Sequence, residues 1–125
     1  MVESTAPAGP GAKTVHFATS ARMSTYITAL CAGPYHEVRD EHDGISLGVF
    51  CRASMAQYLD ADDLFLLTKE GLDFFHEQFG VRYPLPKYDQ LWVPDFNAGA
   101  MENFGCVTHA AVSYTHLTLP TNREV

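Results

Sequence analysis

The carboxylate of Glu102 is the strongest candidate for binding chemistry in this chain. It lies in the run Gly99, Ala100, Met101, Glu102 and Asn103. A fixed carboxylate can bind a cation such as an ammonium group through charge-assisted hydrogen bonds, which are about twice as strong as neutral ones. Because a single Glu beside a Gly is more often a solvated loop residue, the run needs support from the sequence around it.

The flanking residues supply that support. Residues 87–98 lead into the run and residues 104–108 follow it in an order that resembles the aminopeptidase N family of zinc metallopeptidases, whose signature is Gly-x-Met-Glu-Asn. The resemblance extends, with varying strength, from about Phe17 to Thr108. The chain is therefore identified by this resemblance as a member of that family.

The resemblance implies the role of Glu102, and the residue types of its neighbours indicate roles for them. Glu102 would bind the free amino terminus of a peptide, a group that internal positions lack. Small Gly99 and Ala100 would let a substrate backbone pair with this strand edge, and flexible Met101 would line the pocket for the first side chain. Asn103 would hold the turn or orient the carboxylate. The expected partners are peptides with a free amino terminus.

The resemblance also implies zinc, which this family holds with His-Glu-x-x-His on a helix and a further Glu. The His-Glu pairs that begin at His36 and His76 have Asp40 and Gly80 where the second His belongs. Neither pair completes the motif. We therefore expect zinc to be the cofactor of a longer parent protein, with no metal ligand or catalytic residue in this chain and no peptidase activity from the chain alone.

Strand patterns precede the signature in the sequence. Residues 15–17 and 24–30 are rich in β-branched and aromatic residues, which favour strands. Asp43-Gly44 predicts a hairpin turn. Alternating apolar residues after that turn predict a strand with one buried face. These residues are Ile45, Leu47, Val49 and Cys51.

A helix and a further strand follow. Apolar residues at helical spacing predict an amphipathic helix over residues 61–79, with Asp60 as its N-cap and Gly80 at its C-terminal end. Residues 83–86 contain two Pro and predict a connector, and residues 89–93 predict a short strand that delivers the signature. The apolar positions expected to face the core are Leu64, Leu67, Leu72, Phe75 and Phe79.

The change from strand to helix patterns predicts a domain boundary within residues 53–60, and the fold class is α+β. Residues 1–13 are expected to be a loop or disordered lead. From the resemblance, residues 14–56 would be the last strands of an antiparallel β-sandwich-type N-terminal domain. Residues 57–109 would begin an incomplete thermolysin-like catalytic domain.

Residues 110–125 are expected to be a non-native tail. Residues 112–121 resemble the translation of a transposase sequencing adaptor, and the alternative is a natural strand and loop. The zinc helix of the family lies downstream of the signature, so we expect the chain to be truncated before it.

Composition excludes several classes of protein. Eight Lys and Arg stand against fifteen Asp and Glu, and without a basic run this net charge of −7 argues against a nucleic-acid partner. No stretch approaches the roughly 20 apolar residues of a membrane span, and the first residues lack the order of a signal peptide. Three widely spaced cysteines favour a reducing compartment, so a cytoplasmic location is expected.

Two other functions stay open. Relatives that are similar in this segment include an epoxide hydrolase, in which Gly usually takes the place of Ala100. A non-catalytic relative that has lost zinc would also fit the residues present. The sequence downstream of Thr108 separates these alternatives, because only the enzymes require an intact zinc motif.

Overall fold

The computed structural model describes residues 1–111, whose main body is a five-stranded mixed sheet with one helix on one face. The strands lie in the spatial order β3, β4, β5, β7, β6. Pairing is antiparallel at both edges of the sheet and parallel in its centre. The bounds are β3 (Tyr35–His42), β4 (Ile45–Arg52), β5 (Lys87–Val93), β6 (Ala100–Met101) and β7 (Cys106–Ala110). This mixed arrangement confirms the α+β class.

The hairpin of β3 and β4 is as predicted. Asp43 and Gly44 connect the strands with φ angles of 51° and 78°, the left-handed conformation that a tight two-residue turn requires. The alternating residues of β4 point into the core, where Leu47 and Val49 are 1% and 0% exposed. Removing so much apolar surface from water makes β4 the centre of the hydrophobic core.

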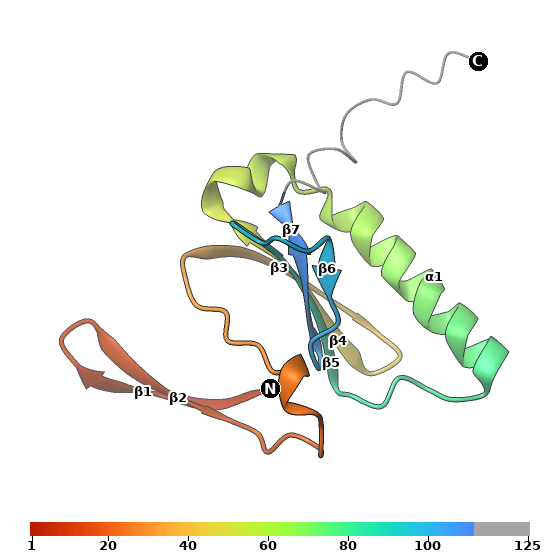
Figure 1. Ribbon diagram of the computed structural model, residues 1–125, viewed down its shortest axis with the longest axis horizontal. Helices are drawn as coiled ribbons and strands as arrows, with labels where there is room; N and C mark the ends of the chain where they lie inside the picture. Colours follow the sequence, from red (N-terminus) through yellow and green to blue (C-terminus); the bar gives the residue numbers. More distant parts are fainter. Residues whose placement is uncertain (112–125) are drawn as a thin grey trace, which may run out of the picture.

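Helix α1 (Ala61–Phe79) has the predicted bounds and covers one face of the sheet (Figure 1). The Asp60 carboxylate accepts a hydrogen bond from the backbone N–H of Asp63 at the N-terminus, and Gly80 adopts a left-handed conformation with φ 66° at the C-terminus. Both ends therefore satisfy backbone groups that the helix itself leaves without partners.

The core-facing side of α1 differs from the prediction. Phe65 is the buried residue of the helix, and Leu64 and Leu72 pack partly against the core. The helix carries a second apolar side that points to solvent. The prediction that Leu67, Phe75 and Phe79 face the core is therefore wrong. The exposed members of this second side are Leu66, Leu67, Phe74, Phe75 and Phe79.

The sheet crosses the predicted domain boundary. The 3₁₀ helix η2 (Ala53–Tyr58) lies at that boundary, yet β4 before it and β5 after it are adjacent parallel strands. A boundary within residues 53–60 is therefore wrong for β3 and β4, which share one sheet with the signature. The sequence pattern changes there because the chain leaves the sheet for α1 and later returns to it.

Two predictions for the N-terminal part are also wrong. Residues 1–13 belong largely to a hairpin of β1 (Val2–Gly9) and β2 (Ala12–Phe17), which projects away from the main sheet (Figure 1). Because every residue of β1 is exposed, no burial pattern marked it as a strand. The strand expected over residues 24–30 is instead the 3₁₀ helix η1 (Thr25–Ile27) followed by extended chain.

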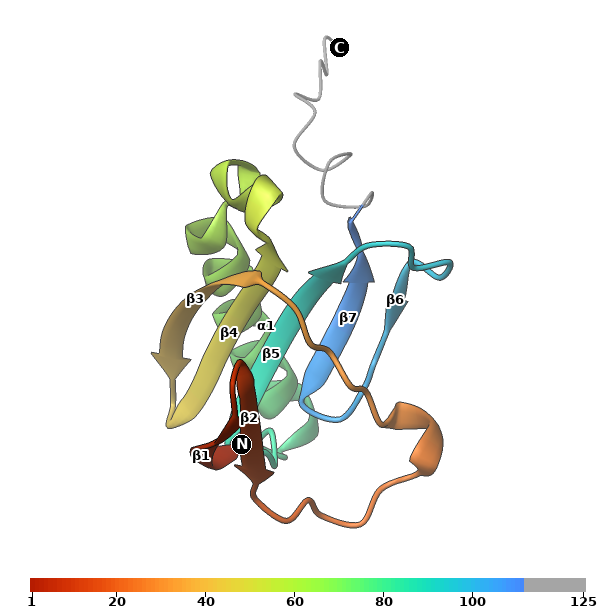
Figure 2. The same ribbon diagram turned by 90° about the vertical axis from the view of Figure 1, so that its left-hand side faces the viewer.

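The segment from residue 18 to residue 34 crosses the face of the sheet opposite α1 (Figure 2). We call it the crossing segment. It returns the chain from the β1–β2 hairpin to β3 and passes beside the signature. In the part that the structure describes, no helix is long and apolar enough to cross a membrane. The predicted adaptor-derived tail from Val112 lies outside the described residues.

Candidate functional site

The signature begins on an open edge of the sheet. Ala100 and Met101 form β6, which pairs antiparallel with His109 and Thr108 of β7. Within residues 1–111 no strand lies on the outer side of β6. A Cβ atom added at Gly99 would meet nothing within 4 Å, so open space lies beside the backbone just before β6. An extended peptide can hydrogen-bond to an edge of this kind.

Glu102 follows β6 directly, and its side chain is exposed. Its carboxylate makes no hydrogen bond or ion pair with any other residue in the range 1–111. The next residue, Asn103, is only 7% exposed. The Glu102 carboxylate, which has no partner among residues 1–111, therefore lies between the open edge of β6 and the buried Asn103. A cationic ligand can reach it there.

Asn103 holds the turn that carries Glu102. Its side-chain amide Nδ2 donates a hydrogen bond of 3.1 Å to Oγ1 of Thr108, and its carbonyl oxygen accepts one of 3.1 Å from the backbone N–H of Cys106. Gly105 completes the turn with φ 66°. The Asn103 side chain therefore joins this turn to β7, and its role in orienting Glu102 stays a prediction.

A cavity of about 430 Å³ lies between the crossing segment and the signature. The backbone N–H of Phe104 donates a hydrogen bond of 3.0 Å to the carbonyl oxygen of Ile27, which fixes the two segments together. Met101 lines the cavity, and its contact with a substrate side chain stays a prediction. Other lining residues, which the sequence did not indicate, include Cys31, Tyr35 and Phe96.

A buried ionic network supports the turn from β5. The carboxylate of Asp89, which is 6% exposed, accepts hydrogen bonds of 2.7 Å from Arg39 Nη1 and 2.6 Å from Lys87 Nζ. Lys87 Nζ also donates to the carbonyl oxygen of Gly105 at 2.8 Å. The network connects β3 and β5 to the turn at Gly105.

His109 lies on the other face of β7, stacked on Trp92 with ring centroids 4.8 Å apart and an interplanar angle of 18°. Its Nε2 atom is buried and has no hydrogen-bond partner among the described residues. Burial lowers the pKa of His109 below its ordinary value of 6.5, because the protonated ring loses its hydration.

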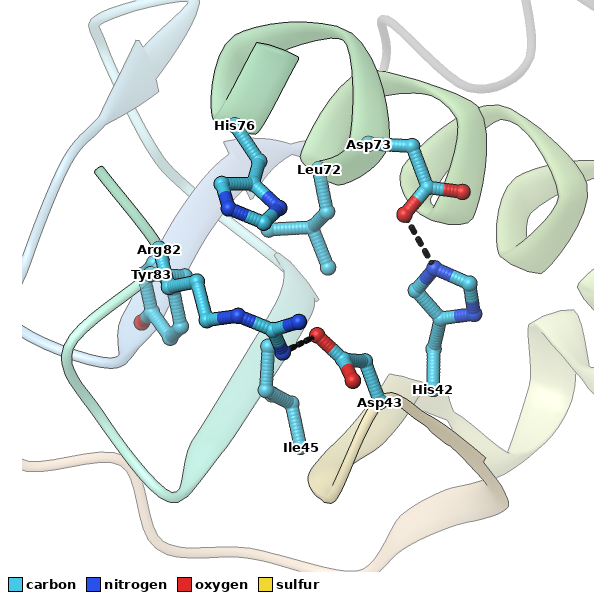
Figure 3. Close-up of a pocket in the computed structure, with 8 residues that line it drawn as sticks. All are labelled: His42, Asp43, Ile45, Leu72, Asp73, His76, Arg82 and Tyr83. Carbon is cyan, nitrogen blue, oxygen red and sulfur yellow. Dashed lines mark hydrogen bonds and ion pairs between the residues drawn. The ribbon is translucent and has the colours of Figure 1, made fainter. Parts of the chain in front are cut away.

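A small hollow of about 50 Å³ lies elsewhere, between α1 and the β3–β4 turn (Figure 3). His42 Nε2 lies 2.7 Å from Asp73 Oδ1, and Arg82 forms an ion pair with Asp43. His42 is thus partly buried and paired with Asp73. The bond from the Arg82 guanidinium lowers the pKa of the Asp43 carboxyl. We interpret this cluster as a link between helix and hairpin.

Metal ligands do not converge in the described part of the chain. Among residues 1–111 no group of three His, Cys, Asp or Glu side chains could hold a metal ion. The zinc that the resemblance implied stays a prediction for a longer protein.

Comparison with known proteins agrees with the signature. Residues 65–122 match the peptidase family M1 domain, and the matched range therefore extends past Thr108, where we expected the resemblance to end. The range overlaps the tail outside the described residues, so the foreign origin of that tail stays a prediction.

Individual relatives cover most of this chain. It is 54% identical over 96 residues to an aminopeptidase N of Streptomyces lividans, a match that covers 74% of this chain and 11% of that protein. An aminopeptidase N of Acetobacter pasteurianus is 37% identical over 109 residues, covering 86% of this chain and 30% of that protein. An aminopeptidase M1 of Arabidopsis thaliana is 43% identical over 99 residues, covering 78% and 11%. The chain spans less than a third of the length of these relatives, and it belongs to peptidase family M1 as a segment related to aminopeptidase N.

Proposed function

We propose that this chain is the part of a zinc aminopeptidase that binds the amino terminus of a peptide substrate. Glu102 accepts hydrogen bonds from the terminal ammonium group, and the open edge of β6 pairs with the substrate backbone. Met101 contacts the first side chain from the adjoining cavity. The observation that carries this proposal is the exposed Glu102 carboxylate, unengaged within residues 1–111, directly beside a free strand edge.

The position of Glu102 fits selectivity for a free terminus. A carboxylate that makes no internal ion pair breaks no bond to another residue when it binds an ammonium ion. A charge-assisted hydrogen bond then contributes about 1.5–3 kcal/mol, which a blocked amine cannot supply. The buried Asn103 and the Asp89 network hold the backbone around Glu102, so that its carboxylate is oriented before the substrate arrives.

The hydrolytic step belongs to other residues of a longer protein in this proposal. Zinc polarises the scissile carbonyl and activates a water molecule in metallopeptidases, and its ligands would lie outside residues 1–111. In this proposal the signature segment is part of a thermolysin-like catalytic domain located in the cytoplasm. The 125-residue chain alone is expected to release no amino acid from peptides.

Two alternative functions differ from this proposal in what the protein would do with its ligand. An epoxide hydrolase of the same family would convert an epoxide to a diol, and Ala100 disfavours it because Gly usually stands there. A non-catalytic relative would bind peptides without cutting them.

Activity of the longer gene product that contains this segment tests the proposal. We expect release of the terminal residue from an amino-acid p-nitroanilide, no release from its N-acetylated form, and loss of activity with a zinc chelator. The isolated chain serves as the matched control and should be inactive. Equal cleavage of free and acetylated substrates, or hydrolysis by the isolated chain, would contradict the proposal.

A further inference from the structure

Lys87, the first residue of β5, joins the buried ionic network to the turn that follows Glu102. Its Nζ atom donates hydrogen bonds to Asp89 Oδ2 at 2.6 Å and to the carbonyl oxygen of Gly105 at 2.8 Å. The same carbonyl oxygen accepts a hydrogen bond of 3.2 Å from the backbone N–H of Asp89. Because Gly105 follows Glu102 closely in the chain, these bonds fix the C-terminal side of the turn.

The backbone of Lys87 is itself held in place. Lys87 pairs with Ser46 where β5 begins beside β4, and the hydroxyl of Tyr83 donates a hydrogen bond of 3.1 Å to the Lys87 carbonyl oxygen. The turn packs closely on this residue, since a Cβ atom at Gly105 would lie 3.4 Å from that oxygen and 3.9 Å from Lys87 Cγ. Lys87 is therefore anchored at its backbone and at its ammonium group.

The charge of Lys87 is balanced within the network. An unbalanced cation beside a site for an ammonium group would repel the ligand. Asp89 pairs with both Lys87 and Arg39, and Arg39 pairs in turn with Glu37. Two cations and two carboxylates leave no net charge, so the network can hold the turn without opposing a cationic ligand.

We propose that Lys87 is a positioning residue, which holds the turn through Gly105 so that the Glu102 carboxylate faces the amine of the substrate. This inference rests on the proposed function and adds to it a residue that does not touch the substrate. Without the ammonium group, the Gly105 carbonyl oxygen would lose one of its two donors and the turn could shift. A misplacement on the order of 1 Å can lower the rate of an enzyme by about a hundredfold.

Kinetics of the longer protein that contains this segment test the role of Lys87. Lys87→Met keeps the length of the side chain and removes the charge, and it should lower kcat/KM for an amino-acid p-nitroanilide by about tenfold. In a protein that already carries Glu102→Gln, Lys87→Met should cause no further fall, because Lys87 acts through Glu102. Lys87→Arg keeps the charge and the donor groups and should retain most of the activity.

Lys69 provides the matched control. It is a partly buried lysine of α1 whose Nζ atom lies 2.5 Å from Asp40 Oδ2, and it makes no bond to the signature turn. Lys69→Met should therefore keep the wild-type kcat/KM. If Lys87→Met does not fold, Lys87→Gln, which keeps one donor group without the charge, takes its place in the comparison.

The outcomes separate this inference from the proposed function. Wild-type kcat/KM in Lys87→Met, or the same loss in Lys87→Arg as in Lys87→Met, would overturn the role of Lys87. An equal fall with and without Glu102→Gln would also overturn it, because a role in folding alone lowers activity in both backgrounds. Wild-type kinetics of Glu102→Gln alone would instead contradict the proposed function, and the role of Lys87 with it.

Discussion

The side-chain amide of Asn103 donates a hydrogen bond to the hydroxyl of Thr108 across the turn that carries Glu102, at 3.1 Å and with both residues buried. This bond joins the end of the signature to the middle of β7. This bond explains why Asn103 is buried although the preceding residue, Glu102, is exposed. The position of Glu102 depends on the pair.

Replacing Asn103 with Ala should lower the free energy of unfolding by about 1–3 kcal/mol, because a buried Thr108 hydroxyl loses its partner. Urea denaturation measures the change. The exposed Asn97 is the matched control, and Asn97→Ala should change the free energy by less than about 0.5 kcal/mol. Equal effects of the two substitutions would exclude the assigned role of the Asn103 side chain.

Gly48 and Gly71 should respond to Ala substitution with opposite signs. A Cβ atom at Gly48 would lie 2.4 Å from Asp89 Oδ1 and 2.8 Å from Arg39 Nη1, inside the ionic network. Gly48→Ala should therefore cost about 1–3 kcal/mol of stability. Gly71 lies within α1 with open space around it, so Gly71→Ala should add about 0.5–1 kcal/mol. Chemical denaturation compares them, and a shared sign would contradict the packing described for β4 and β5.

Truncation of two phenylalanines of α1 should lower the free energy of unfolding by very different amounts. Phe65 is 5% exposed in the core, whereas Phe79 is 72% exposed. Phe65→Ala should cost about 3–5 kcal/mol, and Phe79→Ala less than about 0.5 kcal/mol. Unfolding of the 125-residue chain measures both. Similar losses would restore the prediction, made from helical spacing alone, that Phe79 faces the core.

The stability of the chain should fall as pH decreases through 6.5, in part because of His109. Its folded-state pKa lies below 6.5, so below this pH the unfolded chain takes up a proton that the folded chain excludes. The loss grows until the pH reaches the folded-state pKa. His109→Phe keeps the ring stacked on Trp92 but cannot titrate, and its stability should change less over this range. Identical pH profiles for the two proteins would contradict a buried, neutral His109.

Features set by neighbouring residues were predictable from the sequence. The Asp43-Gly44 turn needs two left-handed residues, and the ends of α1 need Asp60 and Gly80, so each signal lies within the element that it defines. The signature likewise carries the resemblance in the order of its own residues, whereas its role as a binding site stays a prediction. The alternation along β4 identified the centre of the core for the same reason.

Features set by distant residues were not predictable. The parallel pairing of β4 with β5 joins segments on either side of α1, and no local pattern shows which strands become neighbours. The buried side of α1 depends on where the sheet lies, so helical spacing alone did not select Phe65 over Phe79.

The kinetics of Glu102 variants in the longer protein that contains this segment test the central claim most directly. Glu102→Gln preserves size and removes the charge, and exposed Glu41, changed to Gln, is the control. Loss of a charge-assisted bond worth about 1.5–3 kcal/mol predicts a fall in kcat/KM of about tenfold to a hundredfold for substrates with a free amino terminus. The control should retain wild-type kinetics. An unchanged kcat/KM in Glu102→Gln would show that this carboxylate does not hold the substrate amine.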